Sequence, residues 1–444
     1  LIVTAVTFSI TMIFSRQTFS TTVTNISERE AMYDKLAEID SYVRKNYYGT
    51  IDENNLNDYL SVGYIAGLSD RYAAYYSDYA KRQQEDAGKL VGIGIRASKS
   101  ESGFIQVNEV YPDSPAEDAQ IKAGDLIVKV NDIDVTADTY ESAITEIGGQ
   151  AGTKLSLTVR SDNKDREIAE ITRRVVVTPT IYSHMIGTTG YVKITDFNEN
   201  TYDQFKKALE NLVGNQGAQS LIFDLRNNTG GLVDPAIKML DMLLPEGVIA
   251  TATYRDGSTE VLGNSDANCI DLPMAVLTNE NTASAAELFT QALRDYNVAK
   301  SVGTNTYGKG VMQVTHSLKD GSAIRITIAQ YNPPKSANYD GVGIKPDYEV
   351  ALTEEQQAIF DTLDENTDPQ LKKALEVVNA GAAPSETTPA QTQTTEPTTG
   401  KDAETTEPVE NKDGESTTPT EGSETSEPAE GQTDETAKPA EGEE

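Results

Sequence analysis

The sequence predicts a mixed α/β (α+β) fold, in which a helical N-terminal region and a compact, mostly-β module precede a larger α/β core. Three observations predict it. Apolar residues recur every three or four positions near the N-terminus, and short strand-like runs follow between residues 89 and 172. From residue 176 onward, strands and helices alternate through polar loops. We therefore expect segments at residues 1–26, 27–88, 89–172, 173–380 and 381–444.

The composition excludes several classes of protein. The chain has 444 residues, with 37 Lys and Arg against 70 Asp and Glu, a formal net charge of −33. A nucleic-acid binder needs clustered basic residues to meet the phosphate backbone, so this charge argues against that class. One cysteine, Cys269, excludes a disulfide framework and a cysteine-based metal site, and two distant histidines, His184 and His316, argue against a histidine-rich metal site.

The two ends of the chain differ from the rest and from each other. Leu1–Phe14 is uncharged and mostly apolar, although it is shorter than the ~20 residues that span a bilayer. No small-x-small cleavage site follows it, so residues 1–26 are interpreted as a truncated, uncleaved membrane anchor, with a buried helix as the alternative. Residues 381–444 carry 17 Asp and Glu against 3 Lys and no aromatic residue, which predicts a disordered, solvated tail.

Residues 27–88 predict a small helical domain. Ser27 and Glu30 have the spacing of a capping box, and apolar residues at 32, 36, 39 and 43 continue as one helical face towards Gly49. A second helix is expected at residues 53–66, where Gly67 ends it.

Residues 89–172 alternate in the manner of strands. Strands are expected at residues 91–95, 105–110, 125–130 and 154–159, with a helix at 140–147. In the first strand, Gly92 and Gly94 alternate with apolar residues, which indicates either a bulge or the close approach of another backbone.

Residues 173–380 predict the α/β core. Strands are expected at 191–194, 221–225, 274–277 and 323–329, and helices at 202–212, 234–244 and 284–296.

Ser284 stands where a predicted strand, a short polar loop and a helix follow one another. The first N–H groups of a helix are exposed and lie at the positive end of its dipole, so they can stabilise an oxyanion beside a serine hydroxyl. Serine is also a preferred N-cap residue, and from this loop alone the plain cap is the stronger interpretation.

Lys309 is the only fixed charge between residues 301 and 317, and glycines flank it. A lysine in uncharged surroundings loses its proton more readily when it is buried, and the neutral amine can then take a proton from serine. Gln313, four residues on, could orient the amine or a water. A Ser-His-Asp triad that uses His184 or His316 stays open, as does an ordinary surface lysine in a glycine turn.

Four motifs, in this order, resemble those of the carboxy-terminal processing (tail-specific) serine peptidases, over residues 27–380. They are Asp224–Gly231 (DLRNNTGG), Asn279–Glu287 (NENTASAAE), Thr306–Gln313 (TYGKGVMQ) and Gly343–Asp347 (GIKPD). Each motif is weak alone, whereas four in sequence are specific.

The resemblance implies a peptidase core of the ClpP/crotonase-like type with a Ser–Lys dyad and no cofactor. Ser284 would be the nucleophile, Lys309 the general base and Gln313 the residue that positions the lysine. The oxyanion hole would consist of backbone N–H groups, those of Ala285, Gly230 and Gly231.

The mostly-β module resembles the PDZ domain that this family carries, because Ser114–Asp125 matches its helix-turn signature. Backbone N–H groups of such a domain hold a terminal carboxylate while the bound peptide adds as a strand. The binding loop and strand would be Val91, Gly92, Ile93, Gly94 and Ile95.

We therefore predict a bacterial, membrane-anchored, extracytoplasmic serine endopeptidase whose PDZ domain recognises protein substrates by their free C-terminus. The implied partners are peptide or protein substrates, the membrane and, through the N-terminal helices, a second copy of the chain. The alternative is a catalytically silent, PDZ-bearing, membrane-anchored adaptor. The presence of Ser284, Lys309 and Gln313 together argues against the adaptor.

Overall fold

The computed structural model describes residues 26–79, 83 and 87–381. The anchor predicted for residues 1–26 and the tail predicted for 381–444 therefore lie outside the described residues, except for one boundary position each. Within the described ranges, no helix combines the length and the apolar character needed to cross a bilayer.

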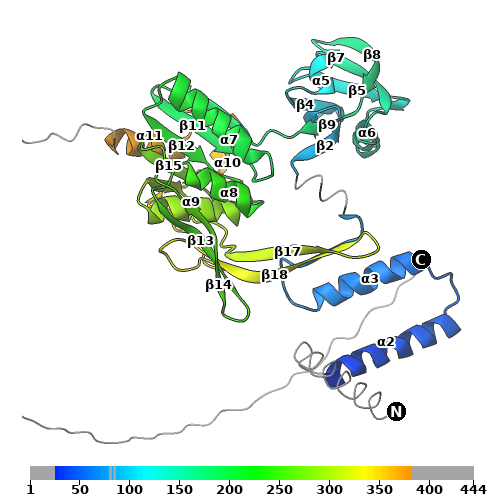
Figure 1. Cartoon of the computed structure of the whole chain (residues 1–444). Helices are drawn as coiled ribbons and strands as arrows, with labels where there is room; N and C mark the ends of the chain where they lie inside the picture. Colours follow the sequence, from blue (N-terminus) through cyan, green and yellow to red (C-terminus); the bar gives the residue numbers. More distant parts are fainter. Residues whose placement is uncertain (1–25, 80–82, 84–86, 382–444) are drawn as a thin grey trace, which may run out of the picture. The chain divides into compact units, whose positions relative to one another are not determined.

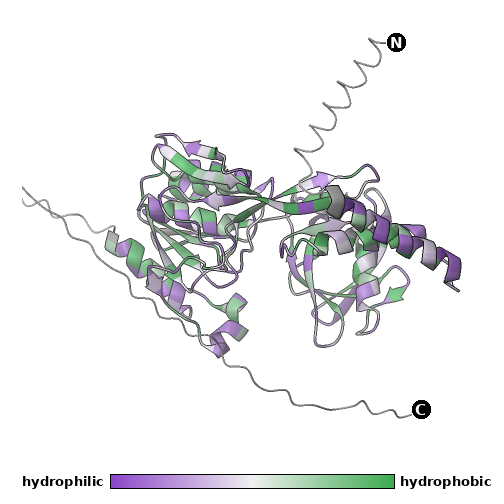
Figure 2. Cartoon of the chain, turned by 90° about the horizontal axis from the view of Figure 1, so that it is seen from below, coloured by the Kyte–Doolittle hydropathy of each residue, from purple (hydrophilic) through white to green (hydrophobic). Residues whose placement is uncertain are grey.

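Two helices form the N-terminal region, α2 (Ile26–Asn46) and α3 (Glu53–Ala66) (Figure 1). Asp52 starts α3, because its carboxylate accepts hydrogen bonds from the first N–H groups of that helix. Apolar side chains such as Ile39 and Tyr64 are exposed, and hydrophobic and hydrophilic residues alternate along the ribbons (Figure 2).

The mostly-β module has its own core. Its elements are β2 (Lys89–Gly92), β3 (Ile95–Lys99), β4 (Ile105–Val110), α5 (Pro115–Asp118), β5 (Leu126–Val130), β6 (Ile133–Asp134), α6 (Tyr140–Ile147), β7 (Lys154–Ser161), β8 (Lys164–Thr172) and β9 (Arg174–Val177). Strands β3, β4, β5, β7 and β8 form one sheet in this order, and β2 pairs with β9. Ile105, Ile127 and Val159 of this sheet are fully buried in one cluster with Ala143 of α6.

The main sheet of the core has the order β10-β11-β12-β15-β16-β19. Its strands are β10 (Ile181–Ile186), β11 (Thr189–Ile194), β12 (Ser220–Asp224), β15 (Met274–Thr278), β16 (Ala299–Gly303) and β19 (Tyr348–Glu349). All but β10 run parallel, so successive strands need crossover connections. The crossovers contain α7 (Thr201–Leu209), which continues as a π-helix (Glu210–Asn215), α8 (Val233–Asp241) and α9 (Ala285–Asp295).

Strand β12 is buried on both faces. Leu221 and Phe223 pack with residues of α7, α8 and α9, whereas Ile222 packs on the opposite face with Leu371 and Ala374 of α11 (Pro369–Gly381). Helices on both faces are typical of a parallel sheet. The loops that follow β12 and β15 therefore start from a fixed base.

A second, antiparallel sheet completes the core. It contains β1 (Ala74–Tyr76), β18 (Ala323–Asn332), β13 (Gly247–Tyr254) and β14 (Thr259–Ser265) in this order, and β17 (Val311–Ser317) also pairs with β18. Because β1 precedes the mostly-β module in the sequence and pairs with β18, that module is inserted into the core. Helix α10 (Glu354–Ala358) and a 3₁₀ turn (Phe360–Thr362) lead to α11. The predicted fold class is confirmed.

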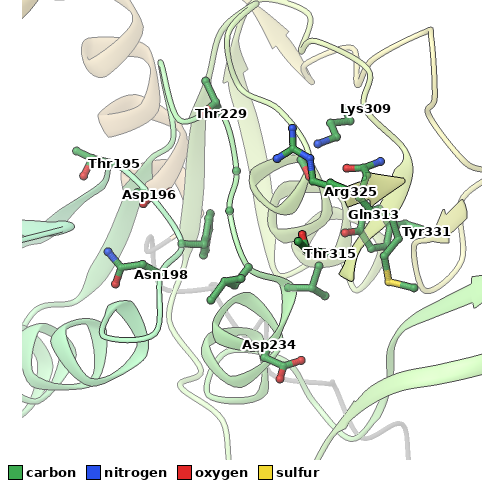
Figure 3. A pocket seen from close by; sticks show the side chains of 17 residues that line it. Thr195, Asp196, Asn198, Thr229, Asp234, Lys309, Gln313, Thr315, Arg325 and Tyr331 are labelled. Atoms are coloured by element: carbon green, nitrogen blue, oxygen red, sulfur yellow. The ribbon is translucent and has the colours of Figure 1, made fainter. Parts of the chain in front are cut away.

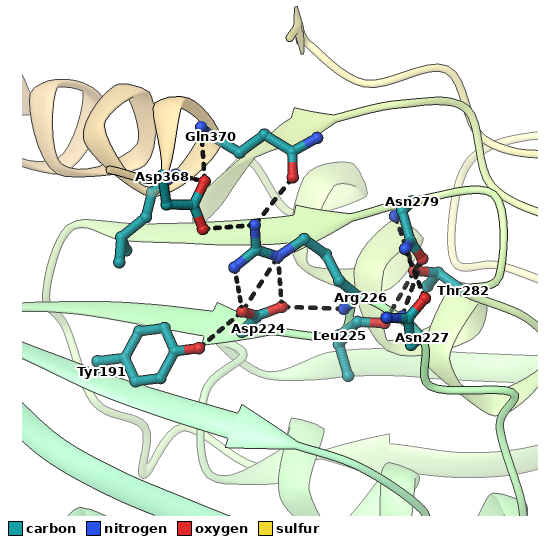
Figure 4. A network of polar contacts seen from close by, with 10 residues as sticks. Tyr191, Asp224, Leu225, Arg226, Asn227, Asn279, Thr282, Asp368 and Gln370 are labelled. Atoms are coloured by element: carbon teal, nitrogen blue, oxygen red, sulfur yellow. Dashed lines mark hydrogen bonds and ion pairs between the residues drawn. The ribbon is translucent and has the colours of Figure 1, made fainter. Parts of the chain in front are cut away.

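A buried ion network joins β12 to the start of α11 (Figure 4). Arg226, 4% exposed, donates from Nε and Nη2 to the Asp224 carboxylate and from Nη1 to Asp368 Oδ2 at 2.7 Å and Gln370 Oε1 at 2.9 Å. Burial alone raises the pKa of Asp224, but the neighbouring guanidinium outweighs it and holds the pKa below its ordinary value. The hydroxyl of Tyr191 also donates to Asp224.

Replacing Arg226 with methionine is expected to lower the free energy of unfolding by about 3–5 kcal/mol, because two buried carboxylates lose their counter-ion. Urea unfolding of the variant measures this. Arg255→Met, at an exposed position of the β13–β14 hairpin, is the matched control. A loss below about 1 kcal/mol in Arg226→Met, within the range of ordinary surface changes, would contradict the assignment.

Candidate active site

A cavity of about 770 Å³ lies where loops of the core meet strands β17 and β18 (Figure 3). Five of the predicted site residues line it, and they are Ser284, Lys309, Gln313, Gly230 and Gly231. In Figure 3, Lys309, Gln313, Arg325 and Tyr331 lie on one side, Asp196 and Asn198 lie on the other, and Asp234 lies below. The folding of the core thus brings together residues that are up to 83 positions apart in the predicted set.

The backbone of Ser284 is unlike that of an ordinary helix cap. Its φ is 57° and its ψ is −119°, whereas an N-cap residue has an extended backbone with negative φ. A non-glycine residue in this region is strained, and such strain is concentrated at functional sites. Ser284 is 4% exposed and immediately precedes α9, as in a strand-turn-helix that presents a nucleophile. The backbone of Ser284 is thus not that of a plain cap, and its role as the nucleophile stays a prediction.

Glu287 joins the serine turn to the lysine loop. Its fully buried carboxylate accepts hydrogen bonds from the backbone N–H of Ser284 at 2.8 Å and that of Lys309 at 2.8 Å, both at Oε2. Its Oε1 accepts from Thr306 Oγ1 at 2.5 Å and from the N–H of Gly308 at 2.7 Å. One side chain thereby fixes the two loops relative to each other. The sequence shows the Ser-x-x-Glu spacing of Ser284 and Glu287. It does not show that the Glu287 carboxylate also binds the backbone of the lysine loop.

The side chain of Lys309 reaches the cavity edge. Its Nζ lies 4.8 Å from the centre of the Tyr72 ring, and no hydrogen bond joins it to Ser284 among the described residues. Burial lowers the pKa of Lys309 below its ordinary value, and the positive charge of Arg325 lowers it further. A lower pKa increases the fraction of neutral amine, the form that can accept a proton.

Gln313 lies on β17 beside the same cavity. Its Nε2 donates to Thr327 Oγ1 at 3.1 Å and to the carbonyl of Val311 at 3.4 Å. Among the described residues, Gln313 contacts β18 through Thr327 and makes no direct hydrogen bond with Lys309. Its role in positioning Lys309 therefore stays a prediction.

Two of the predicted oxyanion donors, Ala285 and Gly230, lie next to Ser284. A methyl group added to Gly230 would lie 2.7 Å from Ser284 Cβ and 3.1 Å from the Ala285 nitrogen, so the glycine turn packs directly on the serine. The Gly230 N–H already donates to Asn228 Oδ1 at 2.8 Å. Phe197 and Gly231 form a parallel bridge, in which the Phe197 N–H donates to the Gly230 carbonyl and the Leu232 N–H donates to the Phe197 carbonyl. This leaves the N–H groups of Ala285 and Gly231 as the donors that the backbone ladder does not engage.

Replacing Gly230 with alanine is expected to reduce peptidase activity at least about 10²-fold, because the turn must move away from Ser284. The glycine also has a φ of 102°, which strains any L side chain. Steady-state cleavage of a peptide reporter measures the loss. Gly257→Ala, a positive-φ glycine of the β13–β14 turn with open space around it, is the control for backbone strain alone.

Tyr331 is not among the predicted site residues. It lies on β18, is 4% exposed and lines the cavity. Burial raises the pKa of its phenol, and the neighbouring Ser284 hydroxyl offsets part of that rise. The phenol of Tyr331 therefore lies beside Ser284 in the cavity. Neither His184 nor His316 is among the cavity residues.

No group of three or more His, Cys, Asp and Glu side chains is placed to hold a metal ion in the part of the chain that the structure describes.

A second cavity, of about 280 Å³, lies in the mostly-β module between α6 and the β2–β3 segment. All five predicted binding residues, Val91 to Ile95, line it with Tyr140 and Ile144 of α6. Strand β3 is at the edge of its sheet, so an added strand can pair with it. Gly94 has a φ of 78°, and a Cβ there would lie 2.3 Å from Ser114 Cβ.

Two segments of the chain match known protein families. Residues 188–350 match peptidase family S41, and residues 106–161 match the PDZ domain. A "Probable CtpA-like serine protease" of Staphylococcus aureus (strain MRSA252) is 31% identical over 363 residues, which cover 79% of this chain and 70% of that protein.

Two solved structures are similar. The crystal structure of a putative S41 protease from Bacteroides fragilis NCTC 9343 has a TM-score of 0.50 and 19% identity, covering 77% of this chain and 97% of that one. The photosystem II D1 C-terminal processing protease has a TM-score of 0.44 and 26% identity, covering 78% and 91%. From its similarity to the S. aureus relative and its two family matches, the chain belongs to the carboxy-terminal processing serine peptidases of family S41 that carry a PDZ domain.

Proposed function

We propose that this serine peptidase is an endopeptidase that uses Ser284 and Lys309 as a catalytic dyad. The observation that carries the proposal is that both residues line one cavity while the Glu287 carboxylate holds the backbone N–H groups of both. Hydrogen bonds on each loop end at the same carboxylate, so the spacing of the two loops is fixed before substrate arrives.

The reaction proceeds through an acyl-enzyme. The neutral amine of Lys309 accepts the Ser284 proton as the hydroxyl oxygen attacks the scissile carbonyl. Backbone N–H groups at Ala285 and the glycine turn stabilise the resulting oxyanion. Lys309 then returns the proton to the leaving amine, and a water molecule, deprotonated by the same lysine, releases the acyl group.

The PDZ domain supplies substrate recognition in this proposal. A peptide would add to the open edge of β3, and its terminal carboxylate would meet backbone N–H groups near Gly92 and Gly94. Apolar residues of the groove, among them Ile95 and Ile144, favour an apolar last residue. The substrates are therefore protein chains with a free, apolar C-terminus.

Cleavage of an unstructured reporter protein tests both parts. Wild type and Ser284→Ala are compared on a reporter that ends in a free apolar carboxylate and on the same reporter with an amidated C-terminus. We expect no cleavage by Ser284→Ala and a KM raised about tenfold or more for the amidated reporter. Equal rates for wild type and Ser284→Ala would refute the nucleophile. Equal rates on both reporters would refute recognition of the C-terminus.

A serine-reactive phosphonate probe tests the adaptor alternative. Labelling of wild type but not of Ser284→Ala supports the peptidase, and a wild type that neither labels nor cleaves would favour the catalytically silent adaptor.

We also propose that the protein is attached to a bacterial cell membrane with its catalytic domain outside the cytoplasm. The support is the apolar, uncharged stretch Leu1–Phe14. Protein that carries residues 1–26 should sediment with membranes after a high-salt wash, and deletion of those residues should release it. A soluble wild type would refute the proposal.

A further inference from the structure

The turn before β1, residues 70–72, brings a side chain from the N-terminal region to the catalytic lysine. Lys309 Nζ lies 4.8 Å from the centre of the Tyr72 ring, within the range of a cation–π contact. The two residues are separated by 237 positions in the sequence. The phenol oxygen of Tyr72 is buried and has no hydrogen-bond partner among the described residues, so the contact depends on the ring alone.

The turn is fixed to β18, the strand that also carries Arg325 and Tyr331. Asp70 accepts hydrogen bonds from the Tyr72 N–H at 2.9 Å and from the Thr327 N–H at 3.0 Å. Arg325 Nε donates to the Tyr72 carbonyl at 3.2 Å, and Ala74 of β1 pairs with Arg325. Tyr72 is therefore held by backbone and partly buried polar contacts, and Arg71 Cζ also lies 4.6 Å from the centre of its ring, so its position does not depend on Lys309 alone.

This anchoring also involves the predicted site residue Gln313. Its amide donates to the hydroxyl of Thr327, whose N–H donates to Asp70. A chain of contacts thus runs from Gln313 through β18 to the turn that carries Tyr72, whereas Gln313 itself makes no hydrogen bond with Lys309 in the described residues.

We propose that Tyr72 is a positioning residue of the Ser–Lys centre, whose ring holds the Lys309 amine at the edge of the catalytic cavity and shields it from water. The inference rests on the proposed dyad. The 70–72 turn, which precedes the inserted PDZ domain in the sequence, then forms part of the active site.

The ring has two opposite effects on the protonation of Lys309. Its π face attracts the ammonium and favours the charged form, while the space it fills keeps water out and disfavours that form. The other charged groups around the amine are Arg325 on β18, Asp70 and Arg71 on the turn and Glu287 on α9. Burial and the two arginines lower the pKa of Lys309, and the two carboxylates raise it.

Substitutions of Tyr72 separate these two effects. Tyr72→Phe keeps the ring and removes an oxygen without partner, so the titration of Lys309 should match wild type. Tyr72→Leu keeps most of the bulk but has no π face, so the pKa of Lys309 should fall by about half a unit or more. Tyr72→Ala admits water, so the pKa should rise above the wild-type value.

Two measurements report this order. The acidic limb of kcat/KM against pH gives the pKa of the free enzyme's base. Independently of activity, acylation of Lys309 in a Ser284→Ala background, followed by mass spectrometry across pH, reports the fraction of neutral amine. Tyr75→Leu is the matched control, since Tyr75 lies on β1 and donates to Asp58 Oδ1, away from Lys309.

The inference is supported if the acylation titration gives Lys309 a lower pKa in Tyr72→Leu than in wild type and Tyr72→Phe, and a higher pKa in Tyr72→Ala. An unchanged titration in both Tyr72→Leu and Tyr72→Ala, with Tyr75→Leu also unchanged, overturns it. If Tyr72→Ala does not fold, the comparison of Phe with Leu decides. Failure of the proposed dyad has a different signature: Lys309→Met then keeps its activity, whatever the acylation titration of the Tyr72 variants gives.

Discussion

Replacing Lys309 with methionine is expected to lower kcat/KM by about 10²–10⁴-fold, because in the proposed dyad the serine then loses its general base. Methionine is close to lysine in length and has no titratable group, so it keeps the packing against Tyr72. Arginine should not restore activity, since a guanidinium stays protonated and cannot accept a proton. Steady-state cleavage of the free-carboxylate reporter measures the loss.

The same substitution should stabilise the folded protein. The pKa of Lys309 is lowered on folding from its ordinary value of 10.5, so the unfolded chain binds more protons between the folded pKa and 10.5. The free energy of unfolding of wild type therefore rises with pH across that window, and the penalty for burying the ammonium is complete below the folded pKa. Lys309→Met lacks this penalty, so its advantage should be largest below the folded pKa, shrink as the pH rises through the window and be smallest above pH 10.5.

Thermal unfolding of wild type and Lys309→Met at several pH values measures this difference. Lys300→Met, at an exposed position of β16, is the control, because its ammonium is not buried. An active Lys309→Met would direct attention to a histidine base. An inactive variant that is also less stable at neutral pH would mean that contacts in the folded protein outweigh the cost of burying the Lys309 ammonium.

The sequence could predict those elements whose signals are local. Helix α3 begins after the capping Asp52 and ends before Gly67, as expected for residues 53–66. Strand β4 and helix α6 also have the predicted bounds. The β13–β14 hairpin was not predicted. Helix α7 ends at Leu209, three residues early, where it becomes a π-helix that no spacing rule signals.

The candidate site was predictable only in part, for a physical reason. Ser284 lies at the start of a helix and Lys309 lies in a glycine-rich loop. Both belong to motifs that resemble those of a known family, so the sequence alone could indicate them. Tyr72 and Arg325 are ordinary residues by sequence, and they become part of the site only because β1 pairs with β18. Contacts between distant strands leave no local pattern, so such residues are found from the fold alone.

The second large effect is expected at Glu287. Its carboxylate accepts four hydrogen bonds, two at each oxygen, and it is fully buried. In Glu287→Gln one oxygen becomes an NH₂ group, which faces two donors and can accept from neither. Each lost bond to a charged acceptor is worth about 1.5–3 kcal/mol, so we expect a free energy of unfolding lower by about 3–6 kcal/mol.

Activity of Glu287→Gln should fall about 10²-fold or more even where the variant is fully folded. The carboxylate fixes the backbone of both Ser284 and Lys309, and a shift of about 1 Å between reacting groups has an effect of this size. The loss should be in kcat, with little change in KM, because the PDZ groove is untouched. Urea unfolding and steady-state kinetics at low temperature measure the two effects separately.

Glu280→Gln is the matched control for Glu287→Gln. Glu280 belongs to the same β15–α9 loop, but its carboxylate is exposed and accepts a hydrogen bond from Thr304 Oγ1 at 3.1 Å. Its change in unfolding free energy should stay within about 0.5 kcal/mol. If Glu287→Gln resembled Glu280→Gln in both stability and kcat, the hydrogen bonds to Glu287 would not be what holds the serine turn against the lysine loop. The spacing of the two loops would then depend on their other contacts, such as the hydrogen bond from the Tyr307 N–H to the Thr282 carbonyl at 3.0 Å.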